Sequence, residues 1–260
     1  MGQYIDVADA SIWYAEEGTG EPLVLLHGGL CTNETWAAQT PPFAQHFHVV
    51  AAERRGHGHT ADVAGPLTYT AMAADMVGFL DQVVGMPAHL VGHSDGGIVA
   101  LMIAIARPDL VAKLVTIGAN YDPSGILPEV HDMFTRTAAD SAEMATLRGP
   151  YEKHSPDGPE HWPIVYQKFV ELIRREPNIS LEELARISAP TLVLVGDDDI
   201  VSLEHTVAMF RAIPKSELAV IPGTSHAVPT EKPELLNRIV LDFLQLEPVA
   251  TTVPIRRARS

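Results

Sequence analysis

Three kinds of side chain that together support nucleophilic catalysis follow separate apolar runs in this chain. The pentapeptide at residues 92–96 reads Gly-His-Ser-Asp-Gly and places Ser94 between two glycines. Consecutive aspartates occupy residues 197–199, and His226 ends the later sequence Gly-Thr-Ser-His. A serine hydroxyl is a weak nucleophile unless a base removes its proton and a carboxylate orients that base. These sites supply, in the chain order Ser, Asp, His, the parts of a serine-nucleophile mechanism.

The elements that must position these side chains are short, continuous apolar runs. Runs of this kind are typical of parallel strands that are buried on both faces. We expect strands at residues 4–7, 11–16, 23–26, 49–52, 88–91, 114–117, 191–195 and 218–221, the first two forming a hairpin. Helical patterns cover residues 68–84, 98–106, 203–213 and 233–246. Alternating strands and helices predict an α/β fold with a mostly parallel sheet, which binds ligands at the carboxyl ends of its strands.

The pentapeptide joins the run at residues 88–91 to the helical pattern at residues 98–106. A serine on a tight strand-to-helix turn projects its hydroxyl out of the fold, and glycine on either side lets the backbone turn that sharply. The context therefore favours Ser94 as a nucleophile, although the pentapeptide alone is a weak signal.

One long stretch interrupts the alternation. Residues 121–188 contain many prolines and short helical pieces but no clear strand. So long an insertion in a compact domain is typical of a functional segment. We expect a core made of residues 1–120 and 189–247, a helical cap over residues 121–188, and a disordered tail over residues 248–260.

Composition excludes several kinds of partner. The net charge of −15 argues against binding to nucleic acid, which needs a basic surface, and disfavours an anionic membrane. No apolar run approaches membrane-spanning length, and no secretory signal precedes the first strand, so we expect a cytoplasmic protein that acts on a small molecule. The single cysteine, Cys31, rules out a disulfide framework within the chain. The sequence gives no indication of oligomeric state.

From about Tyr4 to Leu246 the sequence resembles the α/β-hydrolase fold family. The resemblance rests on His27-Gly28-Gly29, the turn at residues 55–58, the pentapeptide around Ser94, the segment 190–199 and the turn at residues 223–226. It implies an α/β-hydrolase fold in which a helical cap is inserted. Glu53 departs from the family pattern, which often has aspartate there, and we expect it to support the sheet and turn.

The resemblance also assigns roles to individual positions. It implies that Ser94 is the nucleophile and that His226 is the general base and then the general acid. Asp199 matches the usual position of the acid, with Asp197 and Asp198 as weaker alternatives. The backbone amides of Asp95 and Gly29 would form the oxyanion hole, each donor being worth about 3–4 kcal/mol of the barrier. Because these donors belong to the main chain, side-chain identity is expected to matter little there.

The walls of the substrate pocket are harder to predict. Leu30, Trp36, Phe134, Trp162 and Tyr166 are candidates, and Met133 and Phe169 belong to the same set of apolar residues in the cap. The His-x-His pairs at residues 46–48 and 57–59 resemble metal ligands, but nothing completes a ligand set, so we expect neither a metal nor a cofactor. Cys31 is expected to be a buried, inert thiol, and His93 to pack beneath the turn.

These features predict a serine hydrolase that cleaves an ester, lactone or thioester of a small, partly apolar molecule. The same triad is compatible with a carbon–carbon bond hydrolase or a cofactor-free haloperoxidase. Epoxide hydrolases and dehalogenases are disfavoured because they use an aspartate nucleophile. A ligand receptor built on the same fold is the alternative from another class. Specificity lies in the cap and the pocket walls, which the sequence does not resolve.

Overall fold

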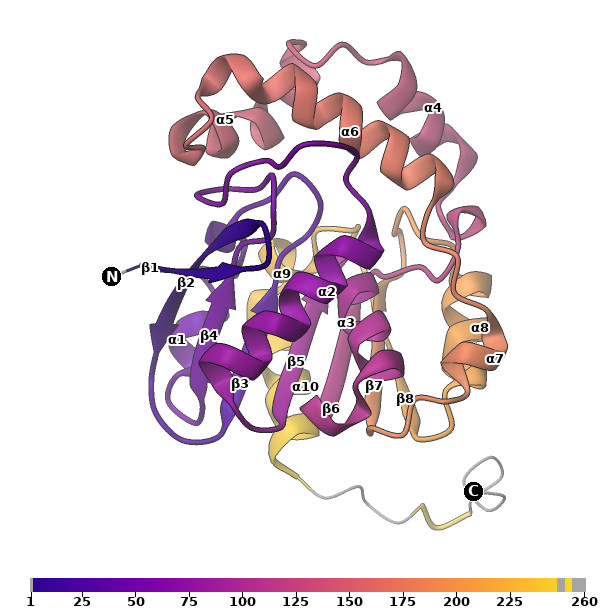
Figure 1. Cartoon of the computed structure of the whole chain (residues 1–260). Helices are drawn as coiled ribbons and strands as arrows, with labels where there is room; N and C mark the ends of the chain where they lie inside the picture. Colours follow the sequence, from indigo (N-terminus) through magenta and orange to yellow (C-terminus); the bar gives the residue numbers. More distant parts are fainter. Residues whose placement is uncertain (1, 247–250, 254–260) are drawn as a thin grey trace.

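A single sheet of eight strands forms the centre of the molecule, seen here in a computed structural model (Figure 1). In sheet order the strands are β1 (Gln3–Val7), β2 (Ala10–Glu17), β4 (His48–Ala52), β3 (Pro22–Leu26), β5 (Ala88–His93), β6 (Val111–Ile117), β7 (Thr191–Gly196) and β8 (Ser216–Ile221). The pairs β1–β2 and β2–β4 are antiparallel, and the strands from β4 to β8 run parallel to their neighbours. The predicted α/β fold with a mostly parallel sheet is confirmed. The structure describes residues 2–246 and 251–253, so most of the tail predicted at residues 248–260 lies outside the described residues.

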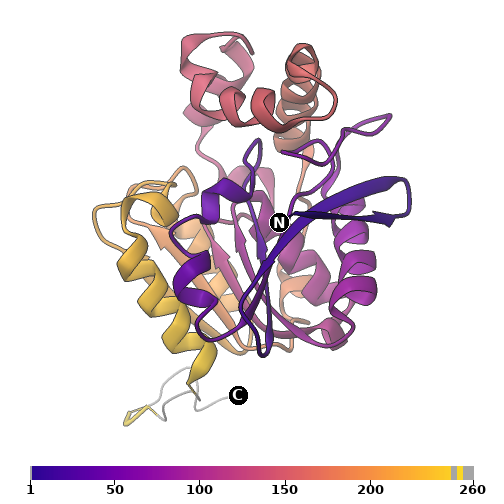
Figure 2. The ribbon, with the colours of Figure 1, turned by 90° about the vertical axis from the view of Figure 1, so that its left-hand side faces the viewer.

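Helices cover both faces of the sheet (Figure 2). On one face lie α2 (Tyr69–Phe79), α3 (Asp95–Ala106) and α8 (Leu203–Ala212), and on the other lie α1 (Thr40–Phe43), α9 (Val228–Glu231) and α10 (Pro233–Gln245). Helix α2 continues into a π-helical turn at Leu80–Val84, and short 3-10 turns occupy Asn33–Trp36 and Pro108–Leu110. Helix α3 begins three residues before the predicted pattern because the turn at Ser94 starts it directly. Across the described residues, no helix combines the length and the apolar character that crossing a bilayer would need.

Side chains along each strand alternate between two apolar clusters on opposite faces of the sheet. In β3, Leu23 and Leu25 belong to the cluster that contains Phe43 of α1, whereas Val24 and Leu26 belong to the cluster on the side of α2 and α3. All residues of β3 are buried. Burying one aliphatic side chain completely contributes about 1.5–3 kcal/mol to the stability of the fold. Packing on both faces therefore holds the strands firmly and fixes the positions of their carboxyl ends.

The segment between β6 and β7 forms a helical cap, which we define as residues 121–188. It contains α4 (Pro128–Arg136), α5 (Ala145–His154), α6 (Trp162–Arg175) and α7 (Leu181–Leu184), with 3-10 turns at Pro123–Gly125, Ala142–Met144 and Pro159–His161. Figure 1 shows α4, α5 and α6 above the carboxyl ends of the strands, while α7 lies beside α8. The cap therefore covers the edge of the sheet where the candidate side chains are located.

Charged pairs fasten the cap to the loops of the core beneath it. Asp62 Oδ2 accepts hydrogen bonds from Lys168 Nζ at 2.6 Å and from His161 Nε2 at 2.9 Å. On α5, Lys153 Nζ lies 2.7 Å from Glu34 Oε1, and a neighbouring histidine shares the same oxygen. The Asp62 carboxylate is nearly buried, so its pairs hold the cap more firmly than the exposed pair at Glu34.

Candidate active site

Ser94 occupies the sharp turn that joins β5 to α3. Its backbone has φ 53° and ψ −121°, a conformation that costs a non-glycine residue about 1–3 kcal/mol. The amide of Ser94 donates to the carbonyl of Ile117 at 2.8 Å, and the amide of Gly97 donates to the carbonyl of Ser94 at 2.8 Å. A Cβ atom at Gly92 would overlap the backbone of Gly96. The two glycines of the pentapeptide are therefore required for this turn, which exposes the serine at the end of the strand.

His226 and Asp199 form a hydrogen-bonded pair beyond the ends of β8 and β7. His226 Nδ1 lies 2.7 Å from Asp199 Oδ1, which also accepts from the amide of Val201 at 3.1 Å, while Oδ2 accepts from the amide of Gly196 at 3.4 Å. Burial alone would raise the pKa of Asp199, but the bond to His226 and these two amides hold that pKa below its usual value. The carboxylate is therefore ionised at neutral pH and can orient the imidazole and stabilise its protonated form.

The other aspartates of the same run have different surroundings. Asp197 Oδ1 accepts from the amides of Gly223 and Thr224, at 2.6 Å and 3.2 Å, and so fixes the turn that precedes His226. Asp198 is exposed, and its amide donates to the carbonyl of Thr224 at 3.1 Å. Of the three acids that the sequence left open, Asp199 is thus the one hydrogen-bonded to the histidine.

Two backbone amides beside Ser94 have no backbone acceptor in the part of the chain that the structure describes. One belongs to Asp95, the first residue of α3, and the other to Gly29, in the loop after β3. The first amides of a helix point outward along its axis and carry partial positive charge. A Cβ atom placed on Gly29 would lie only 2.6 Å from Asp95 Oδ2, so the two segments are in direct contact. Gly29, Ser94 and Asp95 also line one cavity, so these two amides are candidates for an anion site beside the serine.

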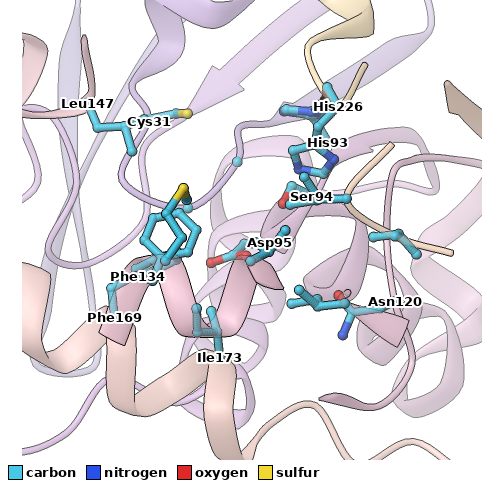
Figure 3. Close-up of a pocket in the computed structure, with 17 residues that line it drawn as sticks. Cys31, His93, Ser94, Asp95, Asn120, Phe134, Leu147, Phe169, Ile173 and His226 are labelled. Carbon is cyan, nitrogen blue, oxygen red and sulfur yellow. Dashed lines mark hydrogen bonds between the residues drawn. The ribbon is translucent and has the colours of Figure 1, made fainter. Parts of the chain in front are cut away.

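Ser94, His226, Gly29 and Asp95 all line one cavity of about 240 Å³ (Figure 3). Its remaining walls are formed by Gly28, Cys31, His93, Asn120, Ile126, Val130, Met133, Phe134, Leu147, Phe169, Ile173, Ile200 and Val201. Polar groups at the strand ends form one side of the cavity, and apolar side chains of the cap form most of the rest. A mostly apolar cavity with a few converging polar groups suits a small molecule. Among the described residues, no hydrogen bond joins Ser94 Oγ to His226.

The structure places most of the predicted pocket residues away from this cavity. Phe134 lines it, but Leu30, Trp36, Trp162 and Tyr166 do not. Trp36 lies in the apolar cluster on the α1 and α10 face of the sheet, whereas the other three are buried inside the cluster beneath the cap. The indole N–H of Trp162 and the hydroxyl of Tyr166 both donate to backbone carbonyls of the cap. These aromatic rings hold the cap together rather than shape the cavity.

The cap contributes other residues to the wall. Val130, Met133 and Phe134 come from α4, and Phe169 and Ile173 come from the second half of α6. Met133 and Phe169 belonged to the wider set of apolar cap residues, while Val130 and Ile173 were missed. The signal that could have found them is their i,i+4 spacing from Phe134 and Phe169, which places each pair on one helix face.

His93 supports the backbone of His226, in keeping with its expected role beneath the turn. Its Nε2 atom lies 2.8 Å from the carbonyl oxygen of His226, and it is almost fully buried. Burial, together with the nearby charge of His226, lowers the pKa of His93 to about 3, so its ring is neutral at physiological pH. Its Nε2–H therefore donates to that carbonyl, which makes His93 a positioning residue for His226.

Buried polar groups hold the loop that carries Gly29. Arg54 Nη1 donates to the carbonyl of His27 at 2.6 Å, and Nη2 donates to the carbonyl of Gly28 at 3.2 Å. The amide of Arg54 in turn donates to His27 Nε2 at 3.2 Å. Glu53 accepts from the amide of Asn33 at 2.9 Å, the supporting role expected for it. These contacts fix the loop from below and leave its upper side to the cavity.

The histidine pairs that resembled metal ligands have other partners. His57 Nδ1 lies 2.9 Å from the carbonyl of Arg55, and His59 Nδ1 lies 2.9 Å from Glu53 Oε2. Within the described residues, no group of three His, Cys, Asp or Glu side chains could hold a metal ion. Cys31 does reach the cavity, and burial raises the pKa of its thiol, which favours the unreactive protonated form.

Comparison with known proteins identifies the family. Residues 23–239 match the model of the alpha/beta hydrolase family. The chain belongs to this family. The match spans the strands from β3 to β8 and the elements that carry Ser94, Asp199 and His226, and the protein is therefore an enzyme of the alpha/beta hydrolase family.

Two relatives and one solved structure show the extent of the similarity. The (E)-2-((N-methylformamido)methylene)succinate hydrolase of Acinetobacter baylyi is 27% identical, over 90% of this chain and 94% of that protein. The 2-hydroxy-6-oxo-2,4-heptadienoate hydrolase of Pseudomonas putida is 29% identical, over 88% of this chain and 91% of that protein. The structure described as "Est816 as an N-Acyl homoserine lactone degrading enzyme" superimposes with a TM-score of 0.79 at 24% identity, covering 93% of this chain and 100% of that one. The last comparison supports the fold alone.

Proposed function

We propose that this alpha/beta hydrolase cleaves an ester, lactone or thioester of a small, partly apolar molecule through Ser94, His226 and Asp199. The observation that carries the proposal is the hydrogen-bonded His226–Asp199 pair facing the same cavity as the strained serine. Strained conformations at functional sites persist because the surrounding structure imposes them, and here the backbone hydrogen bonds of Ser94 to Ile117 and Gly97 do so.

The geometry supports a two-step reaction. As Ser94 Oγ attacks the substrate carbonyl, His226 Nε2 takes its proton, and Asp199 stabilises the imidazolium through the bond to Nδ1. The amides of Asp95 and Gly29 hold the oxyanion. His226 then gives its proton to the leaving oxygen or sulfur, and an acyl-enzyme forms. Water, deprotonated by His226, attacks the acyl carbon and releases the acid, which regenerates the hydroxyl of Ser94.

The cavity supports a small, partly apolar substrate. Its volume of about 240 Å³ and its apolar cap wall of Val130, Phe134, Phe169 and Ile173 suit a compact acyl group. The two relatives described above are named as hydrolases of small organic acids. Neither name fixes the substrate of this chain, because specificity depends on the cavity walls and only about a quarter of the residues are shared with each relative.

The test combines turnover with covalent labelling. Ser94→Ala should abolish turnover of p-nitrophenyl esters and labelling by a fluorophosphonate, and Asp199→Asn should lower kcat by about 10³- to 10⁴-fold because the histidine loses its orienting partner. Ser11→Ala, at an exposed position of β2, is the matched control and should behave as wild type. Near-wild-type turnover by Ser94→Ala would exclude this mechanism. Labelling without multiple turnover of any ester would favour a ligand receptor.

Carbon–carbon bond hydrolysis is the second candidate. It is favoured by the similarity to the 2-hydroxy-6-oxo-2,4-heptadienoate hydrolase of Pseudomonas putida. A screen that offers this dienoate beside aliphatic esters, with release of the acid followed for each, separates the two activities. A preference for the dienoate of more than about tenfold in kcat/KM would assign the site to carbon–carbon cleavage.

A further inference from the structure

The carboxyl group of Asp95 is a buried polar group that the proposed mechanism does not use. The mechanism needs only its backbone amide. The residue is 4% exposed, and its Oδ2 atom has no hydrogen-bond partner among the described residues, although the residue lines the cavity (Figure 3). Leaving a buried carboxylate oxygen without a donor is costly, and most such groups in folded proteins are paired. Because Asp95 lines the cavity, a ligand bound there can supply the missing donor.

Neighbouring side chains of the protein influence the charge of this carboxyl group. The positive charge of the buried Arg54 guanidinium favours the ionised form of this carboxyl group, and so does the Tyr69 hydroxyl. Burial opposes both effects, and the pKa of Asp95 is raised on balance. Arg54 is itself fixed by the carbonyls of His27 and Gly28. The side chain is therefore buried beside a fixed positive charge and is nearly inaccessible to solvent.

The free oxygen lies close to the place where the reaction would occur. Asp95 directly follows Ser94, and Oδ2 is so near Gly29 that a Cβ atom on that glycine would lie 2.6 Å from it. Oδ2 thus lies against Gly29, and both residues line the cavity that contains Ser94. The facing walls, which include Phe134 and Ile173, are apolar. A single acceptor in such a wall fixes the orientation of a ligand and contributes specificity.

We propose that Asp95 is a specificity-determining residue whose Oδ2 accepts a hydrogen bond from an O–H or N–H group on the acyl part of the substrate, next to the scissile carbonyl. The proposal rests on the proposed function, because it takes the Asp95 amide as an oxyanion donor. Arg54 already compensates the charge of the carboxylate, so a neutral donor such as a hydroxyl suffices. An ammonium group would donate a hydrogen bond to the same oxygen, and its positive charge would also attract the carboxylate.

Three methyl esters of equal size test the proposal. They are those of 3-phenylpropionate, of 2-hydroxy-3-phenylpropionate and of 2-amino-3-phenylpropionate, which differ only in the donor beside the carbonyl. We expect wild-type kcat/KM to favour at least one donor-bearing ester over the unsubstituted one by roughly 10- to 100-fold, the range for a hydrogen bond to a charged group. Asp95→Leu, of similar size but without an acceptor, should reduce that ratio to about 1.

The decisive quantity is the ratio of kcat/KM for a donor-bearing ester to kcat/KM for the unsubstituted ester. A substitution that only shifts the Asp95 amide changes the rates of all three esters together and leaves this ratio unaltered. Asp95→Asn retains an acceptor oxygen but loses the charge, so it should keep a preference for the hydroxyl ester and lose one for the amino ester. Asp132→Asn, which removes an exposed carboxylate on α4, controls for net charge and should leave the ratio unchanged. No preference in the wild type, or the same preference in Asp95→Leu, would overturn the proposal.

A binding measurement separates this proposal from the proposed function. If no ester is turned over, the hydrolase mechanism fails, but the shift in Tm of Ser94→Ala protein with the same three esters still reports on Asp95. Larger shifts with the donor-bearing esters that disappear in the Ser94→Ala, Asp95→Leu double variant support the role of the carboxyl group. Equal shifts with all three esters overturn it.

Discussion

Replacing Gly29 by alanine tests whether its amide belongs to the reaction site. The added Cβ would lie 2.6 Å from Asp95 Oδ2 and would overlap the ring of Phe169, where ordinary contacts are about 3.5–4 Å. One of the two segments must therefore move by about 1 Å. A displacement of this size near reacting atoms costs about 10²-fold in rate, and loss of one oxyanion donor costs about 10²–10³-fold. We expect kcat/KM for Gly29→Ala to fall by about 10²–10³-fold.

The assay pairs steady-state hydrolysis of p-nitrophenyl esters with thermal unfolding, because overpacking should also cost about 1–3 kcal/mol of stability. Gly149→Ala in α5 is the matched control, since a Cβ there would meet no atom within 4 Å. Alanine has a higher helix propensity than glycine, but the ring of Pro150 disfavours the helical conformation of the residue before it. We therefore expect little net change in stability or in kcat/KM. Gly29→Ala protein that unfolds at a lower temperature but keeps more than a third of wild-type kcat/KM would refute the assignment of this amide.

Two further predictions concern stability. Burial lowers the pKa of His57 to about 3, so between that value and the unfolded pKa of about 6.5 only the unfolded chain binds the proton. Stability should therefore fall with falling pH, by about 1.4 kcal/mol per pH unit from this ring, and His57→Gln should remove that part of the slope in urea unfolding between pH 6 and pH 4. An unchanged slope would contradict the buried neutral ring. In the same measurement, Asp75→Asn, which breaks a buried pair with two 2.6 Å bonds to Arg55, should cost about 3 kcal/mol. Asp81→Asn, at an exposed pair, should leave stability unchanged, and equal effects of both would refute this reasoning.

The positions of the strands along the chain could be predicted because burial on both faces dictates their side chains. Runs such as Leu23–Leu26 have no polar position, and this excludes a half-exposed strand or an amphipathic helix. The ends of these runs then fix where Ser94, Asp199 and His226 lie, because parallel strands deliver their carboxyl ends to one edge. The family pattern ranked Asp199 above Asp197, and the structure adds the partner of each carboxylate, His226 for Asp199 and the amide of Gly223 for Asp197.

The walls of the cavity could not be predicted in the same way. Helix α6 has apolar residues along its whole length, and all of Trp162, Tyr166, Phe169 and Ile173 are buried or nearly so. Only the last two reach the cavity, because the first two pack against other parts of the cap. Periodicity shows which face of a helix is covered but not what covers it. The expectation that side-chain identity matters little at the two amides was wrong for Gly29, where a Cβ atom would overlap the ring of Phe169.

The cap is inserted between two strands that are direct neighbours in the sheet. Ile117 at the end of β6 pairs with Leu194 of β7, so the pairing of the sheet does not pass through the cap. Ser94, Asp199 and His226 all lie outside the inserted segment, whereas Val130, Phe134, Phe169 and Ile173 lie within it. Mutations in the insertion can therefore alter which molecules fit while leaving the reactive groups in place. Substrate selectivity can therefore diverge between descendants of one gene while the proposed catalytic residues stay unchanged. For the same reason, residues 121–188 are the segment to exchange when a new substrate is sought.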